Sequence, residues 1–433
     1  MKYIQRSSLL FISGLLIAAT VAIGTDGAWD VQRRAAASEI DVISEYRMEL
    51  APHRALTPQE ELAAQRAWRF IERNTRSETG LVDSVAGFPS TTLWDQGSYV
   101  MALTAAYKLG VIQSEEFQER AQQFLDSFIE LPLFEGQLPN KAYDTRTLAM
   151  VNYQNEVSEK GIGWSALDVA RMLLAFRTLE RVAPEFGEDV RSVLALWDLS
   201  SMAENGELIG TEVKNGEVVF RQEGRLGYEQ YGARAAGLWG LDVLRAISAQ
   251  RILKWIEVEE VLVPTDLRTA ASFQAISPIV SEPFVLLALE LGLDSEMRRL
   301  AEQVYMAQEA RYRDTGVMTM VSEDHVDQDP FFLYASVYAD GVAWDVVTES
   351  GASFPELRTI SLKAAFGWDA LFDTAYSDHL VAQMQAQGDA EYGWPAGLYE
   401  SDLSVNEVYT LNTNAVVLEA LHYIVHGPLW QAK

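Results

Sequence analysis

The sequence of 433 residues contains no cysteine, so a packed core rather than disulfide bonds must supply its stability. Basic residues are also scarce: 34 Lys and Arg stand against 62 Asp and Glu, which gives a formal net charge of −28. Phosphate backbones are bound by basic surfaces, so this charge argues against a nucleic-acid partner. It also disfavours polyanionic polymers unless basic residues concentrate locally. Neutral ligands fit the composition best.

Motifs for several common chemistries are missing. There is no glycine-rich phosphate loop and no Gly-x-Ser-x-Gly nucleophile motif. The five histidines show no spacing typical of metal ligands. The acidic run at 324–329 (DHVDQD) lacks the turn glycine of a calcium-binding loop, so we interpret it as a solvated loop. We therefore expect neither a metal nor a cofactor.

One apolar segment lies at the N-terminus. Residues 9–24 follow Lys2 and Arg6 and end in small residues, which is typical of an export signal. The run is shorter than the ~18 residues of a comfortable membrane span. The sequence predicts a cleaved signal peptide or a retained signal anchor at 1–24, followed by a polar lead-in at 25–56. We thus expect an exported protein, periplasmic or extracellular, whose only membrane contact would be an uncleaved anchor in the inner membrane.

From residue 57 onwards, two kinds of helix alternate. Thr57 and Glu60 form a capping-box pattern at the first helix start. Amphipathic helices, such as the one around Phe117 and Phe124, separate helices that are apolar nearly all round and must therefore be surrounded by protein. The exception is the junction after Leu241, where the sequence alternates like strands. The six apolar helices are expected at 93–109, 164–176, 226–241, 283–293, 357–372 and 411–425.

This alternation predicts an all-α fold, in which helical hairpins wrap into a double-layered (α/α)6 toroid decorated by small β-hairpins. Residues 57–433 would form this single domain. The inner helices of such a ring run parallel, so the loops that enter them meet on one face. Those loops hold unusual numbers of acids, aromatics and polar residues. We therefore expect the functional site at this face.

Acids beside aromatic rings at these loops suggest glycoside hydrolysis, in which one carboxyl group protonates the leaving oxygen and another activates water or attacks. Asp95 can also be interpreted as the first-turn acid of a helix capped by Thr92. Asp168 is interpreted as a buried partner of Arg171 or of a backbone group. The candidate catalytic residues are Asp95, Glu223 and Glu229. The candidate substrate-binding residues are Trp94, Lys141, Tyr143, Asp144, Trp164, Arg225, Tyr228, Trp394, Tyr399, Glu400 and Asn412.

Four motifs resemble the bacterial DUF3131 family of exported proteins. They are residues 89–95 (PSTTLWD), 161–168 (GIGWSALD), 223–229 (EGRLGYE) and 411–414 (LNTN). That family is similar to glucoamylase-like (α/α)6 toroids, which include endo-β-1,2-glucanases. The resemblance implies a toroid with a site for an oligo- or polysaccharide. It assigns no catalytic residue.

The leading hypothesis is an exported glycoside hydrolase that acts on a neutral β-glucan or exopolysaccharide by two-carboxylate acid/base catalysis. The alternative is a non-catalytic glycan-binding partner of a polysaccharide synthesis or export system. Two acids that face one cavity favour the enzyme, whereas aromatics with a single usable acid favour the binding protein. A polysaccharide lyase would need cations to neutralise a uronate, which the net charge of −28 disfavours.

Overall fold

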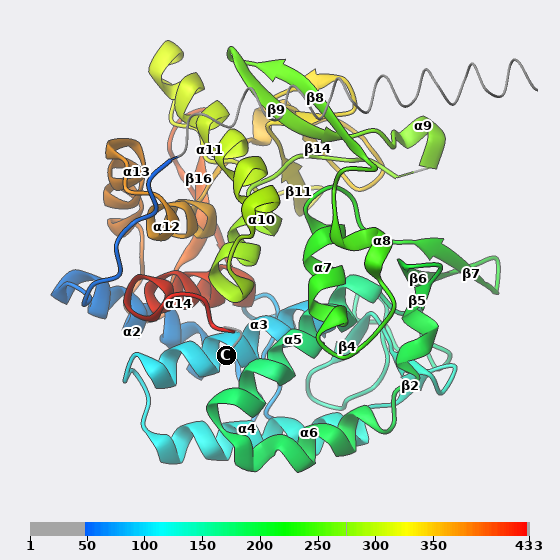
Figure 1. Cartoon of the computed structure of the whole chain (residues 1–433). Coiled ribbons are helices and arrows are strands. Elements are labelled where there is room, and N and C mark those ends of the chain that lie inside the picture. The colour runs from blue at the N-terminus through cyan, green and yellow to red at the C-terminus, as the bar shows by residue number, and fades with distance from the viewer. Residues whose placement is uncertain (1–47, 274, 431–433) are drawn as a thin grey trace, which may run out of the picture. The chain divides into compact units, whose positions relative to one another are not determined.

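Six apolar helices contact one another in a closed cycle, at the positions that the sequence pattern indicates. In the computed structural model, which describes residues 48–430 except 274, each helix touches the next and the last touches the first. In Figure 1, α14 lies between α12 and α3. These inner helices are α3 (Leu93–Lys108), α5 (Ala166–Val182), α7 (Tyr228–Gly237), α10 (Glu282–Leu286) with its π-helical continuation η3 (Leu287–Leu291), α12 (Leu362–Leu371) and α14 (Leu411–His426).

A second set of helices covers this cycle. Each member contacts an inner helix: α2 packs on α14, α4 on α3, α6 on α5, α8 on α7, α11 on α10 and α13 on α12. The amphipathic α4 buries Phe117, Phe124 and Phe128 on its inner face. The bounds are α2 (Pro58–Asn74), α4 (Ser114–Glu130), α6 (Gly187–Leu194), α8 (Leu244–Ile247), α11 (Ser295–Thr315) and α13 (Ala375–Gln385), and a further short helix is α9 (Ala270–Phe273).

Two details of the outer set bear on the sequence analysis. Thr57 and Glu60 form the expected capping box at the start of α2. The junction after Leu241 does contain a helix, the four-residue α8, before the strand pair β8–β9. Its shortness explains why no amphipathic pattern marks it.

Short antiparallel strands decorate the loops. Several lead directly into an inner helix, as β1 leads into α3 and β15 into α12, so they fix where each helix begins. The paired strands are β1 (Ser90–Thr92) with β4 (Ala142–Asp144), β2 (Leu133–Phe134) with β3 (Leu138–Pro139), β5 (Ala203–Glu204) with β6 (Glu207–Lys214) and β7 (Glu217–Gln222), β8 (Leu253–Val258) with β9 (Val261–Asp266), β10 (Glu323–His325) with β11 (Phe332–Ala335) and β14 (Val346–Val347), β12 (Tyr338–Ala339) with β13 (Val342–Ala343), and β15 (Thr359–Ser361) with β16 (Pro395–Tyr399) and β17 (Val405–Tyr409).

The acidic run at 324–329 is not a solvated loop throughout. Asp324 is buried within β10, whereas Asp327 and Asp329 are exposed. The interpretation was wrong for Asp324 because a buried cation, Lys363, lies 3.6 Å from it and compensates its charge.

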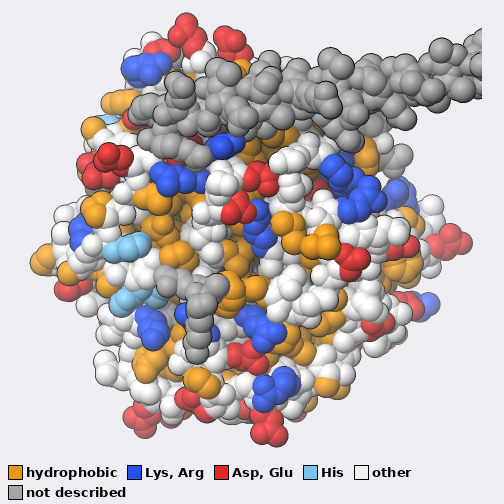
Figure 2. Space-filling view, in the orientation of Figure 1, with side chains coloured by type: hydrophobic (Ala, Val, Ile, Leu, Met, Phe, Trp, Pro, Cys, Tyr) orange, Lys and Arg blue, Asp and Glu red, His pale blue; other side chains and the backbone are white. Residues whose placement is uncertain are grey.

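Charged side chains of both signs are interspersed on the face of the molecule that Figure 2 shows. Within the described residues, no helix combines the length and apolar character needed to cross a membrane. The predicted signal at 1–24 and most of the lead-in, 25–47, lie outside the described residues. Glu49–Lys433 form one compact unit.

Candidate functional site

Asp95 sits in the first turn of α3, where β1 turns into the helix. The Thr92 hydroxyl accepts a hydrogen bond from the Asp95 backbone N–H at 3.1 Å, so the expected N-cap is present. Asp95 Oδ2 accepts hydrogen bonds from Thr92 (2.9 Å) and Ser84 (2.5 Å). Its Oδ1 accepts none from the residues that the structure describes. The half-buried carboxyl group thus supports the helix start and leaves one oxygen for a ligand.

Asp168 and Glu223 meet at the start of α5. The hydroxyl of Ser165, the N-cap residue, lies 2.8 Å from Asp168 Oδ1 and 2.7 Å from Glu223 Oε1. It already accepts a hydrogen bond from the Asp168 backbone N–H. A hydroxyl has one proton, so it can make a full hydrogen bond to both oxygens at once only when one of the two carboxyl groups is itself protonated. This geometry favours a state in which Asp168 and Glu223 share one proton.

The surroundings favour that proton on Asp168. Glu223 Oε2 also accepts a hydrogen bond from the Ala166 backbone N–H at 2.6 Å, which stabilises a charged carboxylate. Burial, followed by the charge of Glu223, raises the pKa of Asp168 to about 7. Burial also raises the pKa of Glu223, against the opposing effects of Ser165 and Lys141. One member of the pair can hence remain protonated near neutral pH.

A third carboxyl group, that of Asp95, acts electrostatically on Asp168. The charge of Asp95 contributes to the raised pKa of Asp168, which places Asp95 within electrostatic range of the pair. The half-buried Lys141 lowers the pKa of both members of the pair. Its ammonium group therefore lies within electrostatic range of the two carboxyl groups.

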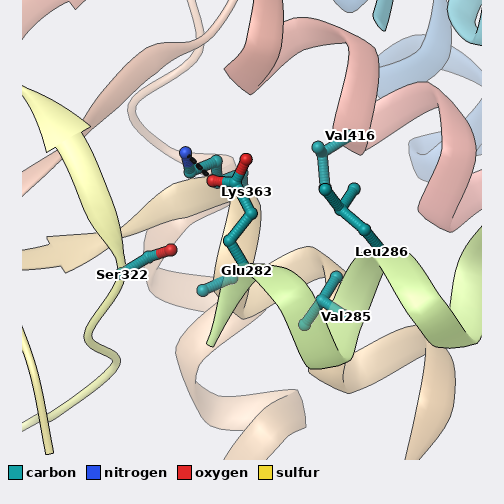
Figure 3. A pocket seen from close by; sticks show the side chains of 7 residues that line it. Glu282, Val285, Leu286, Ser322, Lys363 and Val416 are labelled. Atoms are coloured by element: carbon teal, nitrogen blue, oxygen red, sulfur yellow. Dashed lines mark ion pairs between the residues drawn. The ribbon is translucent and has the colours of Figure 1, made fainter. Parts of the chain in front are cut away.

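A second group of charges surrounds the start of α10 and α12. Figure 3 shows the ion pair between Lys363 and Glu282, with Val285, Leu286 and Val416 nearby. Asn412 donates a hydrogen bond to Glu282 Oε1 at 2.9 Å.

Glu323 and Asp324 on β10 complete this group. Burial and the charge of Glu282 raise the pKa of Glu323 to about 8, and burial raises that of Asp324 to about 7. Burial and the charge of Glu323 also raise the pKa of Tyr228 well above its ordinary value. Tyr228, the first residue of α7, therefore lies near these acids.

Aromatic rings lie between the two groups. Trp94 is half-buried and contacts Tyr228 edge-on, with ring centroids 5.8 Å apart. The Arg171 guanidinium lies 4.5 Å from the Trp94 ring centroid. Arg171 does not pair with Asp168, as the sequence analysis proposed, but with Glu290 (2.9 Å) and Glu419 (3.5 Å). Arg171 is buried among the inner helices, where Glu290 and Glu419 are its ion-pair partners. Asp168 therefore has no ion pair with Arg171.

Several predicted residues lie within the fold. Trp164 and Trp394 are each 1% exposed and donate their indole N–H groups to the backbone oxygens of Ile209 and Ala63. The Tyr143 hydroxyl donates to the Pro132 carbonyl and accepts from the Asn140 N–H. Such rings expose no face on which a sugar could stack.

Four charged or polar candidates are held by other partners. Although burial opposes it, hydrogen bonds from Arg146 lower the pKa of Asp144 to about 2. Glu400 accepts hydrogen bonds from Arg311 (2.9 Å) and Arg358 (2.8 Å), and the Tyr399 hydroxyl donates to Asp327. Glu229 is 1% exposed and pairs with Arg268, which also binds Asp266. Glu229 is therefore placed in a buried ion cluster, not beside Asp168.

Six of the predicted site residues lie in or beside the two groups of charges: Asp95, Glu223, Trp94, Lys141, Tyr228 and Asn412. Arg225 instead lines a hollow at the end of β7. Sequence reasoning missed Asp168, Glu282, Glu323 and Lys363. A signal existed for Asp168, because Ser165 and Asp168 repeat the spacing of Thr92 and Asp95 at the start of an apolar helix. Within the described residues, no group of three or more His, Cys, Asp or Glu side chains is arranged so that it could hold a metal ion.

Fold and site together define a helical protein whose inner helices begin at a carboxylate-rich, partly aromatic site. The model of the family described as "Protein of unknown function (DUF3131)" matches residues 62–427, and the chain belongs to this family. No curated protein matches the sequence.

Solved glucanase structures share the fold. An endo-β-1,2-glucanase from Chitinophaga pinensis, solved with sophorotriose and glucose, has a TM-score of 0.63 and 13% identity, covering 87% of this chain and 94% of its own. The endo-β-1,2-glucanase of Talaromyces funiculosus, solved with sophorose, has a TM-score of 0.57 and 14% identity, with coverages of 84% and 83%. At such identities the likeness establishes the fold and leaves the substrate open.

Proposed function

We propose that this protein is a glycoside hydrolase that cleaves a β-glucan or a related exopolysaccharide. The observation that carries the proposal is the pair Asp168–Glu223 on one Ser165 hydroxyl, within electrostatic range of Asp95. We also propose that the cycle of inner helices and its outer partners form an (α/α)6 toroid. The fold shared with endo-β-1,2-glucanases supports both proposals.

The Asp168–Glu223 pair would supply the general acid. A glycosidic oxygen needs a proton as its bond to the sugar breaks, and a carboxyl group that stays protonated near neutral pH can give it. Asp168 holds the proton in the resting state, and the Ser165 hydroxyl links it to Glu223. Either carboxyl group can therefore receive a proton again through this hydroxyl after each turnover.

Asp95 would be the second carboxylate. Inverting glycosidases keep their two carboxyl groups about 6.5–9.5 Å apart, so that a water molecule fits beside the sugar. Asp168 and Glu223 contact the same hydroxyl and are too close together for that arrangement. Asp95 stands at the start of another inner helix and keeps one oxygen without a partner among the described residues. In this proposal Asp95 activates water, and the reaction inverts the anomeric configuration.

The sugar would be held by the aromatic and polar side chains around these acids. Trp94 and Tyr228 offer ring faces or edges, and sugars stack on such rings through their apolar C–H faces. Lys141 and Asn412 carry donors for sugar hydroxyl groups. A single carboxyl group would suit a glycan-binding partner, but three carboxyl groups with one extra proton exceed what binding requires. The site therefore favours the enzyme over the non-catalytic alternative.

Affinity and turnover measured on the same glycan separate these two functions. Wild type and Asp168→Asn would be compared for binding of β-1,2-glucan and for release of reducing ends. Hydrolase function predicts similar binding, with turnover in wild type alone. If both proteins bind and neither releases reducing ends from β-glucans or other exopolysaccharides, the glycan-binding alternative replaces the enzyme. Export through residues 1–24 remains part of the proposal and would be tested by fractionation of the producing cell.

A further inference from the structure

A hollow of about 310 Å³ lies beside the end of β7, and its lining does not include Asp95, Asp168 or Glu223. Small-molecule sites occupy about 300–1,000 Å³, so it has room for one small ligand. No lining residue is acidic, although acids outnumber bases almost two to one in the whole chain. The hollow is lined by Phe220, Arg221, Gln222, Arg225, Ser272 and Phe273.

Arg225 has an incompletely used guanidinium group. Its Nη1 donates to Gln222 Oε1 (2.9 Å) and to the Gly224 carbonyl (2.7 Å). Its Nε is buried without a hydrogen-bond partner, and its Nη2 donates to no described residue. It forms no ion pair with a described carboxylate, whereas Arg221 pairs with Glu212 at 3.1 Å. Arg225 therefore keeps donors and charge for a ligand.

The charges around Arg225 leave it under-compensated. Burial and the neighbouring Arg268 lower its pKa, while Asp266, Glu229 and Asp340 act in the opposite direction. Two of these acids, Asp266 and Glu229, are already bound to Arg268. An anion in the hollow would thus meet a guanidinium that lacks a dedicated counter-ion, and charge-assisted hydrogen bonds to such a group are strong.

Two exposed aromatic rings flank the same hollow. Phe220 is 60% exposed and Phe273 is 48% exposed. Trp164 supports Phe220 from within the fold, with ring centroids 5.9 Å apart. The Arg225 guanidinium lies 5.6 Å from the centroid of the Phe273 ring. Exposed rings beside a cavity indicate a binding surface, and flat rings suit the apolar face of a sugar.

We propose that this hollow binds an acidic sugar, with its carboxylate on Arg225 and its ring against Phe220 or Phe273. The proposal goes beyond hydrolysis, because it concerns a second site whose occupancy does not require bond cleavage. Arg221 and Arg225 give the hollow a local positive charge, which would let a chain of net charge −28 bind an anionic sugar unit. A guanidinium alone would suit any oxyanion, whereas the two rings select one that carries a sugar.

The test is equilibrium binding of monosaccharides to the full chain. Glucuronate, glucose and inorganic phosphate would be titrated by calorimetry into wild type, Arg225→Gln and Phe273→Ala. A matched control is Arg313→Gln, which removes an exposed arginine paired with Asp314. We expect glucuronate to bind at least tenfold more tightly than glucose or phosphate. We expect Arg225→Gln to weaken glucuronate binding by tenfold or more, Phe273→Ala to weaken it to a smaller extent, and Arg313→Gln to leave it unchanged.

Other outcomes overturn the proposal. Equal binding of glucose would remove the role of the carboxylate, and equal binding of phosphate would remove the role of the rings. Glucuronate binding that survives Arg225→Gln, in a protein with the wild-type circular dichroism spectrum, would place it elsewhere. Because no bond is cleaved, a protein that fails as a hydrolase can still pass this test, and the reverse also holds.

Discussion

Asp168 and Glu223 lie on either side of one serine hydroxyl, 2.8 Å and 2.7 Å from Ser165 Oγ, although 55 residues separate them in sequence. Two negative charges so close together in a partly buried site would repel each other strongly. One proton between them removes the repulsion and gives the hydroxyl a complete set of partners. The start of α5 thus holds a carboxyl group whose pKa is raised to about 7.

Removing either member of this pair should abolish turnover. Asp168→Asn and Glu223→Gln each keep the shape of the side chain but can no longer exchange a proton. Loss of general acid assistance costs about 10²–10⁴ in rate. Initial rates of reducing-end release, compared at equal amounts of folded protein, check this. A rate within threefold of wild type for both variants would show that the pair is structural.

The raised pKa of Asp168 predicts two effects of pH. Activity should fall as pH rises through about 7, because the acid then loses its proton. The free energy of unfolding should also depend on pH through Asp168. In the unfolded chain Asp168 loses its proton near pH 4, whereas in the folded chain it keeps the proton to about pH 7. The native state binds more protons across this window, so the contribution of Asp168 to stability declines as pH rises through it.

Urea unfolding of wild type and Asp168→Asn between pH 4 and 8 isolates the stability effect. Asp324, Asp369 and Glu323 also have raised pKa values and contribute to both proteins alike. The variant should therefore gain stability relative to wild type between about pH 4 and 7. A constant difference across that range would mean that Asp168 titrates normally.

The two roles of Asp95 separate in two variants. Thr92→Ala removes the N-cap hydroxyl and should lower the free energy of unfolding by about 1 kcal/mol, with activity largely kept. Asp95→Asn retains most of the hydrogen-bonding capacity but removes the charge that would activate water, so it should lose 10²-fold or more in rate. Thermal unfolding and initial rates of both variants give the answer. If Asp95→Asn kept the wild-type rate but unfolded at a lower temperature, Asp95 would act only in capping the helix.

Glu229, a candidate catalytic acid from sequence, should prove structural. Glu229→Gln weakens the buried contact with Arg268 and should cost about 2 kcal/mol of stability, since hydrogen bonds to charged groups contribute about that much. Its initial rate below the melting transition should stay near that of wild type. A loss of more than 10²-fold in rate at unchanged stability would return Glu229 to the catalytic set.

The inner helices were predictable because their signal is local. A helix that is apolar on every side must be buried wherever it lies, and six such segments sit where the pattern put them. The four-residue α8 was missed because it is too short to show a period. Strand pairs such as β8–β9 were visible as alternation.

The site was predictable only in part, because pairing between distant residues is not local. Asp168 and Arg171 are three residues apart on one helix, which suggested a pair, yet Arg171 reaches Glu290 and Glu419 on two other inner helices. Trp164 and Trp394 were predicted to bind substrate, yet both pack into the core. Only the folded chain decides which loop residues face the site.

The central claim is that this chain hydrolyses a glycan with the Asp168–Glu223 pair. The most direct measurement is incubation of the purified protein with a panel of β-1,2-, β-1,3- and β-1,4-glucans and bacterial exopolysaccharides, followed by detection of new reducing ends. We expect release from at least one neutral β-glucan by wild type, and none above background by the double variant Asp168→Asn/Glu223→Gln. No release from any polymer, or equal release by the double variant, would contradict it.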